Sequence, residues 1–156
     1  MIRRIPIIVL SFGMMLLFSS DAPAEESPFE LVKSWLDGNN LVYVTTEKNE
    51  IALGFKGDNI PRVDIIIGFS DEFIHLSVPV GKIPEDAGKD YYSGLINITG
   101  PIPMIKPFID KEYFCYIVID FPLTGLSEDE VISDIALLVE FADRHSKELY
   151  PWEEEN

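Results

Sequence analysis

The sequence predicts an α+β protein with a single antiparallel β-sheet and helices on one face, in the order α-ββββ-α-ββ-α. Two observations support this fold class. Hydrophobic and polar residues alternate between Leu41 and Val80, which is the period of a half-buried strand. Ser27 and Ser127 are each followed three positions later by glutamate, a pattern typical of the first turn of a helix.

The first helix is expected over residues 28–37. Ser27 takes the N-cap position, Pro28 the first helical position and Glu30 the third, which together form a capping box with a preset first turn. Gly38 is expected to provide the left-handed residue that ends the helix. The apolar stripe of this helix consists of Leu31, Val32, Trp35 and Leu36.

Six strands are expected, four before a short second helix and two after it. The links between the first four are of hairpin length and rich in turn-forming residues, which favours an antiparallel meander. The second helix is expected between Gly81 and Gly100, and Asp110-Lys111 is the turn of the last strand pair. The expected strands are Leu41–Thr46, Glu50–Lys56, Arg62–Phe69, Glu72–Val80, Met104–Ile109 and Glu112–Phe121.

The last helix is expected to begin after Ser127, whose capping box ends at Glu130. Two oppositely charged pairs spaced i,i+4 are expected on its solvent-exposed side, Glu140–Arg144 and Asp143–Lys147. Its buried stripe is expected to consist of Val131, Ile135, Leu138, Val139 and Ala142.

The first 24 residues have the layout of a signal peptide. Two arginines precede an apolar stretch, Ile5–Phe18, that is shorter than the roughly 20 residues a membrane-spanning helix needs. Cleavage is expected after Ala24, in Ala22-Pro23-Ala24, which predicts a periplasmic or secreted protein that meets the membrane only through its signal peptide. An uncleaved anchor is the alternative. The domains are then a signal peptide (1–24), one α+β domain (25–149) and an acidic C-terminal tail (150–156).

The composition is strongly acidic, with 27 acidic and 12 basic residues and a net charge of −15. Such a charge repels nucleic-acid phosphates, so nucleic acid is not an expected partner. Basic proteins, cationic peptides or divalent metals would be attracted. The alternative interpretation is an acidic surface that binds water alone.

The sequence contains no recognisable catalytic, metal or cofactor motif. Cys115 is the only cysteine, which excludes an internal disulfide, and its place in an alternating strand predicts that it is buried. Zinc ligand pairs, a nucleophile elbow, phosphate loops and the regular calcium loop are all missing. We therefore predict no catalytic residue, no metal site beyond weak surface binding, and no cofactor. No spacing singles out a Ser/His/Asp arrangement.

A candidate binding surface lies on the less apolar side of the predicted sheet. Phe114, Tyr116 and Val118 are out of phase with the core residues of the last strand, and water alone is an unusual environment for such side chains. Phe73 and His75 share this side; His75 is either a ligand-facing or a surface imidazole. We expect the surface to form a homodimer contact or a groove for a partner. Alternatively, the second helix or the acidic tail covers it.

The element order, the Leu95-Ile96-Asn97 segment before the last strand pair, and the run Phe121–Val131 into a capped helix resemble the YbjN-type bacterial domain. The resemblance covers residues 27–149. That family is described as proposed sensory transduction regulators and is similar in fold to class I type III secretion chaperones, which implies dimerisation. The expected function is an exported, non-enzymatic binding or regulatory module of the bacterial envelope. A chaperone-like holder of another exported protein is the second hypothesis, and an enzyme of unidentified activity the last.

Overall fold

The computed structural model of the protein describes residues 27–151, so the predicted signal peptide and residues 152–156 of the acidic tail lie outside the described residues. The strands form one antiparallel six-stranded sheet in the order β1-β2-β3-β4-β6-β5, which confirms the predicted fold class and element order. A short helix, α4, follows the expected elements. The elements are α1 (Pro28–Gly38), β1 (Tyr43–Thr45), β2 (Ile51–Phe55), β3 (Val63–Phe69), β4 (Phe73–Lys82), α2 (Lys89–Thr99), β5 (Lys106–Ile109), β6 (Phe114–Pro122), α3 (Glu128–Arg144) and α4 (Ser146–Leu149).

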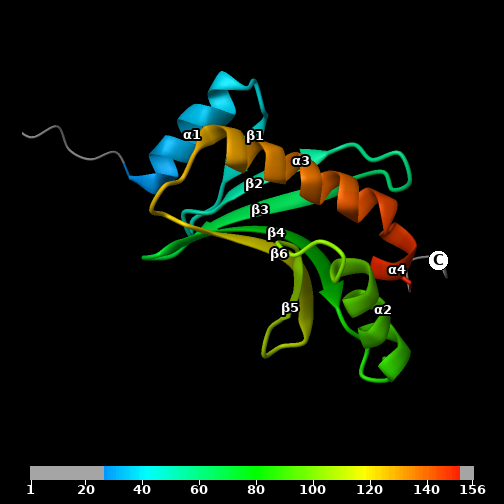
Figure 1. Cartoon of the computed structure of the whole chain (residues 1–156). Coiled ribbons are helices and arrows are strands. Elements are labelled where there is room, and N and C mark those ends of the chain that lie inside the picture. Colours follow the sequence, from blue (N-terminus) through cyan, green and yellow to red (C-terminus); the bar gives the residue numbers. More distant parts are fainter. Residues whose placement is uncertain (1–26, 152–156) are drawn as a thin grey trace, which may run out of the picture.

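The helices cover one face of the sheet, which we call the inner face. Figure 1 shows α3 running across the strands with α1 beside it, while α2 and α4 lie together near the C-terminal end of α3. Apolar side chains from alternate strand positions fill the space below the helices, as the period of two predicted. These buried strand residues are Ile51, Leu53, Val63, Ile65, Ile67, Ile74, Leu76, Val78, Cys115, Ile117 and Ile119.

Helix α1 begins as predicted but ends later. The Ser27 hydroxyl accepts a hydrogen bond from the Glu30 amide at 3.3 Å, and Pro28 opens the helix. The left-handed residue is Asn40, with φ of 55°, and not Gly38, which lies within the helix. Asn39 explains the shift, because its side chain donates to the Trp35 carbonyl at 2.9 Å and caps the last turn.

The hairpin turns are held by their own side chains. At the β5–β6 turn, one carboxylate oxygen of Asp110 accepts hydrogen bonds from the amides of Glu112 (2.8 Å) and Phe114 (2.9 Å). Tyr113 adopts a positive φ of 65°, so this turn extends beyond Asp110-Lys111. Several strands are shorter than predicted, among them β1, which has three residues, and β5, which begins at Lys106.

Helix α3 has the predicted start, and the predicted Glu140–Arg144 ion pair is present. The prediction that Asp143 pairs with Lys147 is wrong. Asp143 turns instead to the β2–β3 loop, where it accepts bonds from the Asn59 amide (2.8 Å), the Asn59 side chain (3.0 Å) and the Ile60 amide (3.1 Å). Three fixed donors satisfy this carboxylate better than one flexible lysine.

Candidate functional site

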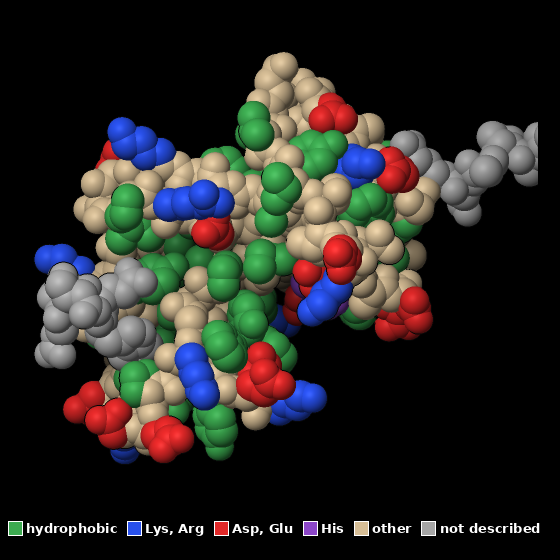
Figure 2. Space-filling view, turned by 180° about the vertical axis from the view of Figure 1, so that it is seen from behind, with side chains coloured by type: hydrophobic (Ala, Val, Ile, Leu, Met, Phe, Trp, Pro, Cys, Tyr) green, Lys and Arg blue, Asp and Glu red, His purple; other side chains and the backbone are tan. Residues whose placement is uncertain are grey.

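The face of the sheet turned away from α1 and α3, called the outer face here, is formed by the strand positions that alternate with the core. Figure 2 views the molecule from this side and shows hydrophobic side chains gathered down its middle. The outer-face residues are Val44, Ala52, Gly54, Asp64, Ile66, Gly68, Phe73, His75, Ser77, Pro79, Lys82, Lys106, Phe108, Phe114, Tyr116, Val118, Asp120 and Pro122.

The strand register arranges these side chains by size. One row crosses all six strands, in the order Val44, Ala52, Ile66, Ser77, Val118, Lys106. The middle of this row has small side chains, Ala52 and Ser77, and the neighbouring positions include Gly54 and Gly68. The surface is therefore shallow there. Larger apolar side chains rise at both ends, with Val44 66% exposed on β1 and Phe108 53% exposed on β5. A partner would thus find a shallow floor between two apolar rims.

The structure places the predicted trio of β6 together on the outer face. Phe114 is 38% exposed, Tyr116 is half-buried, and Val118 is only 8% exposed. The Tyr116 ring lies 6.2 Å from that of Phe108, a neighbour that the sequence analysis missed because the β5–β6 turn is longer than predicted and sets a different register. Partial burial, with the nearby charges of Asp110 and Glu112, raises the pKa of Tyr116. The trio's binding role stays a prediction.

The other two predicted residues lie at the opposite end of β4. Phe73 pairs with Pro122 in register, whereas Phe114 pairs with Lys82 at the far end of the same strand pair. The Phe73 ring is 6.3 Å from the His75 ring. The five predicted residues therefore share one face but form two separate groups on it.

His75 belongs to a polar cluster that joins three strands. Its Nδ1 lies 2.6 Å from one carboxylate oxygen of Asp120, and Lys106 forms an ion pair with the other. Burial alone would raise the pKa of Asp120, but the hydrogen bonds from Lys106 and His75 outweigh it and lower that pKa. The cluster thus holds a carboxylate in its charged form on the outer face.

The same imidazole lies 3.2 Å from the Ser70 hydroxyl, which gives a Ser-His-Asp arrangement that the sequence did not single out. The hydroxyl already serves its own turn: it accepts from the Phe73 amide and donates to the Phe73 carbonyl, both at 3.1 Å. A serine whose proton is held by its backbone, at an exposed hairpin tip, is poorly placed as a nucleophile. We interpret the arrangement as a set of hydrogen bonds that stabilises the β3–β4 turn.

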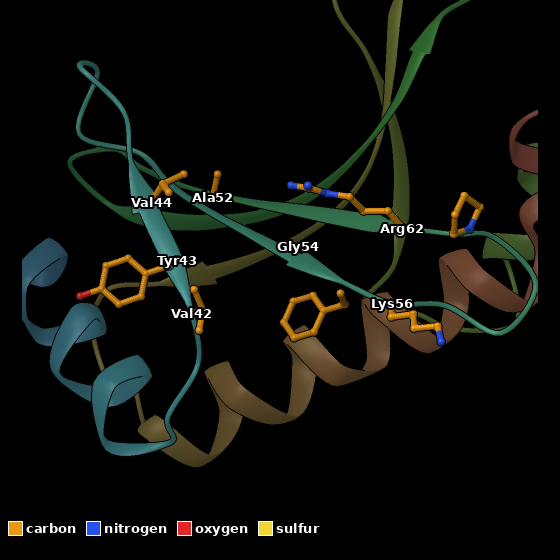
Figure 3. Close-up of a pocket in the computed structure, with 9 residues that line it drawn as sticks. Val42, Tyr43, Val44, Ala52, Gly54, Lys56 and Arg62 are labelled. Carbon is orange, nitrogen blue, oxygen red and sulfur yellow. The ribbon is translucent and has the colours of Figure 1, made fainter.

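A hollow of about 370 Å³ opens beside β1 and β2. The Arg62 side chain crosses it toward Ala52 (Figure 3) and donates from Nε to the Asp64 carboxylate at 2.6 Å. Gly54 leaves room for this crossing, since a Cβ there would lie 2.8 Å from an Arg62 nitrogen. Its lining includes Val42, Val44, Ala52, Gly54, Lys56 and Arg62.

Between residues 27 and 151, no group of three or more His, Cys, Asp or Glu side chains is arranged to hold a metal ion. Cys115 is buried, as predicted, and desolvation raises the pKa of its thiol. None of the helices within this range is long and apolar enough to span a bilayer.

These features define a class of protein: a small α+β domain whose single antiparallel sheet has helices on one face and an exposed apolar rim on the other. No protein-family model and no curated protein sequence matches the chain. Several solved structures share its fold, and two of them are described here.

The first is YbjN, described as a proposed transcription regulator from E. coli, which is 16% identical, with a TM-score of 0.58 over 76% of this chain and 87% of that chain. The second is the HopA1-SchA chaperone-effector complex, in which the matching chain is 14% identical, with a TM-score of 0.50 over 72% of this chain and 87% of that chain. The predicted resemblance to YbjN and to secretion chaperones is therefore confirmed at the level of fold.

Proposed function

We propose that this protein is a non-enzymatic binding module that holds another protein chain against its outer face. The observation that carries the proposal is the exposure of large apolar side chains on a sheet face turned away from the main helices, with Phe108 and Phe114 as the clearest cases. Contiguous apolar surface of this kind marks interaction sites in soluble proteins. The aromatic side chains provide most of the contact area.

The likeness to a chaperone-effector complex supports a specific form of this function. In that form the protein is a chaperone-like holder of another exported protein, as against a regulatory module of the envelope. The signal peptide predicted over residues 1–24 supports action outside the cytoplasm in both cases. The protein's net charge of −15 supports a protein partner over a nucleic acid.

A homodimer is the second candidate for what covers the outer face. The four helices contain ten acidic and four basic residues, whereas the six strands contain two of each. Two copies approaching through their helices would repel each other, so the outer face is the side on which self-association costs least.

The test replaces Phe114 and Tyr116 together by serine. If these rings belong to an interface, the double variant should turn a dimer into a monomer or abolish partner capture from an envelope fraction. Its melting midpoint should change little, because neither ring is fully buried. Light scattering, capture and thermal melts give the three readings.

Ile96→Ser is the matched control, because Ile96 is an exposed apolar residue (63%) that lies on α2 and not on the outer face. The control should keep the dimer or the captured partner. A monomeric wild type that captures nothing would contradict the proposal. So would a double variant that loses about 3–5 kcal/mol of stability, as core aromatics do.

A further inference from the structure

The charges of this acidic protein are divided unevenly between its two sides. Both acidic residues of the strands, Asp64 and Asp120, are already engaged in ion pairs on the outer face. The Lys82 side chain, on the same face beside Phe114, forms no ion pair or hydrogen bond with the residues that the structure describes. Among the strand residues, the outer face therefore has no carboxylate without a cationic partner, despite the net charge of −15.

The hollow beside β1 and β2 also offers hydrogen-bond donors to a ligand. Arg62 uses only its Nε to bind Asp64, so its two terminal nitrogens have no acceptor in the part of the chain described. Lys56, at the other end of the hollow, has no ion-pair partner there either. A guanidinium presents its donors in a planar fork that matches a carboxylate.

The apolar side chains at the edge of the hollow are exposed to solvent, like its two cationic side chains. Val42 is 87% exposed and Val44 is 66% exposed, and both line the hollow together with Ala52. Gly54 has no side chain, and the guanidinium lies directly over it in the hollow. The hollow thus offers an ionic contact and an apolar contact to adjacent groups of one ligand.

We propose that this hollow binds an aspartate or glutamate of the protein segment held on the outer face, with a neighbouring apolar side chain packed on Val42 and Val44. The inference rests on the proposed binding function and names the chemistry of the partner. It reverses what net charge alone suggests, namely a cationic partner. The carboxylate anchors the segment at the β1 end of the sheet, and the segment's aromatic or aliphatic residues reach toward Phe108.

The experiment selects ligands from a displayed library of random twelve-residue peptides on the purified, immobilised protein at low ionic strength. Selected peptides should contain Asp or Glu next to Val, Ile, Leu or Phe. Fluorescence anisotropy with one labelled peptide should show roughly tenfold weaker binding to Arg62→Gln and to Lys56→Gln, the size expected for one charge-assisted hydrogen bond. Changing the peptide's carboxylate to its amide should weaken binding by at least a similar factor, and by less in the Arg62→Gln variant than in the wild type.

Lys48→Gln is the matched control, because Lys48 is an exposed lysine in the β1–β2 turn and does not line the hollow. It should bind the peptide as the wild type does. Selection of lysine-rich or uncharged peptides overturns this inference, as do acidic peptides that bind both hollow variants normally. In either case the proposed function survives if the Phe114/Tyr116 variant loses the peptides. If no peptide is selected, both the inference and the proposed function fail.

Discussion

Asp134 shows how a single side chain can work against the stability of this fold. It lies on α3 and is only 7% exposed. Burial, and secondly the charge of Glu130, raises its pKa, because both disfavour the ionised carboxylate. The carboxylate forms no ion pair or hydrogen bond with the other described residues, so its charge is not compensated.

Asp134→Asn should therefore stabilise the protein at pH 7. A raised folded-state pKa means that the ionised carboxylate destabilises the fold at neutral pH, and that this penalty disappears as pH falls below the unfolded-state value of about 4. Urea melts at pH 7 and pH 3 should show the gain only at pH 7. A variant less stable than the wild type at pH 7 would mean that the carboxylate has a stabilising partner.

Gly57 is required by a contact and not by its backbone angles. A Cβ at this position would lie 2.2 Å from an Asp143 carboxylate oxygen and 2.6 Å from the Ile60 carbonyl. Gly57→Ala should destabilise the protein by about 2 kcal/mol or more, because it displaces a carboxylate that accepts three hydrogen bonds. Gly38→Ala is the control, since nothing lies within 4 Å of its Cβ, and denaturant melts of the two should differ clearly.

Contacts between residues distant in sequence were the least predictable. The Asn59–Asp143 bond joins positions 84 apart, and the His75–Asp120 bond joins positions 45 apart. Periodicity predicts which way a side chain faces, but it gives no information about which strand or loop lies opposite. The buried position of Cys115, by contrast, depends on phase alone and was predicted.

Among the elements, α3 has the start that is best defined by sequence. The Ser127 hydroxyl accepts from the Glu130 amide at 3.4 Å and donates to the Glu130 carboxylate at 2.8 Å. Ser127→Ala should lower stability by about 1 kcal/mol, because end amides of the helix lose an acceptor. Ser133→Ala within the same helix is the control and should change stability little. Equal urea midpoints for wild type and Ser127→Ala would contradict this role of the cap.

The types and order of the expected elements followed from the sequence, whereas several of their ends did not. Helix α1 includes Gly38 because Asn39 caps the helix with a side-chain hydrogen bond, which residue spacing alone does not reveal. Strand β5 is shorter than predicted. Its neighbourhood contains Pro101, Pro103 and Pro107, and the alternation of apolar and polar residues is a poor guide to strand ends near prolines.

At the scale of the whole molecule, the main expectation concerns processing. The mature protein should begin at Glu25, since the basic start, the apolar stretch and Ala22-Pro23-Ala24 act together as an export signal. Mass spectrometry of the protein from an envelope fraction gives its first residue. Ala24→Leu should slow cleavage and leave more precursor. An intact Met1 that sediments with membranes would contradict both processing and release.

The candidate site was predictable in part at this scale. The phase of β6 predicted that Phe114, Tyr116 and Val118 share the face opposite the core. Phe108 and the hollow around Arg62 needed the three-dimensional arrangement, because they depend on the register of β5 against β6 and on an arginine side chain crossing Gly54.

The two open edges of the sheet have a consequence for the behaviour of the protein at high concentration. Strand β1 has three residues, and β5 has four, one of which is Pro107 and has no amide hydrogen. Short edges and edge prolines are poor templates for adding a strand, so they protect a sheet from growing into a fibril. This domain can therefore keep an apolar face uncovered without risking cross-β aggregation along its edges.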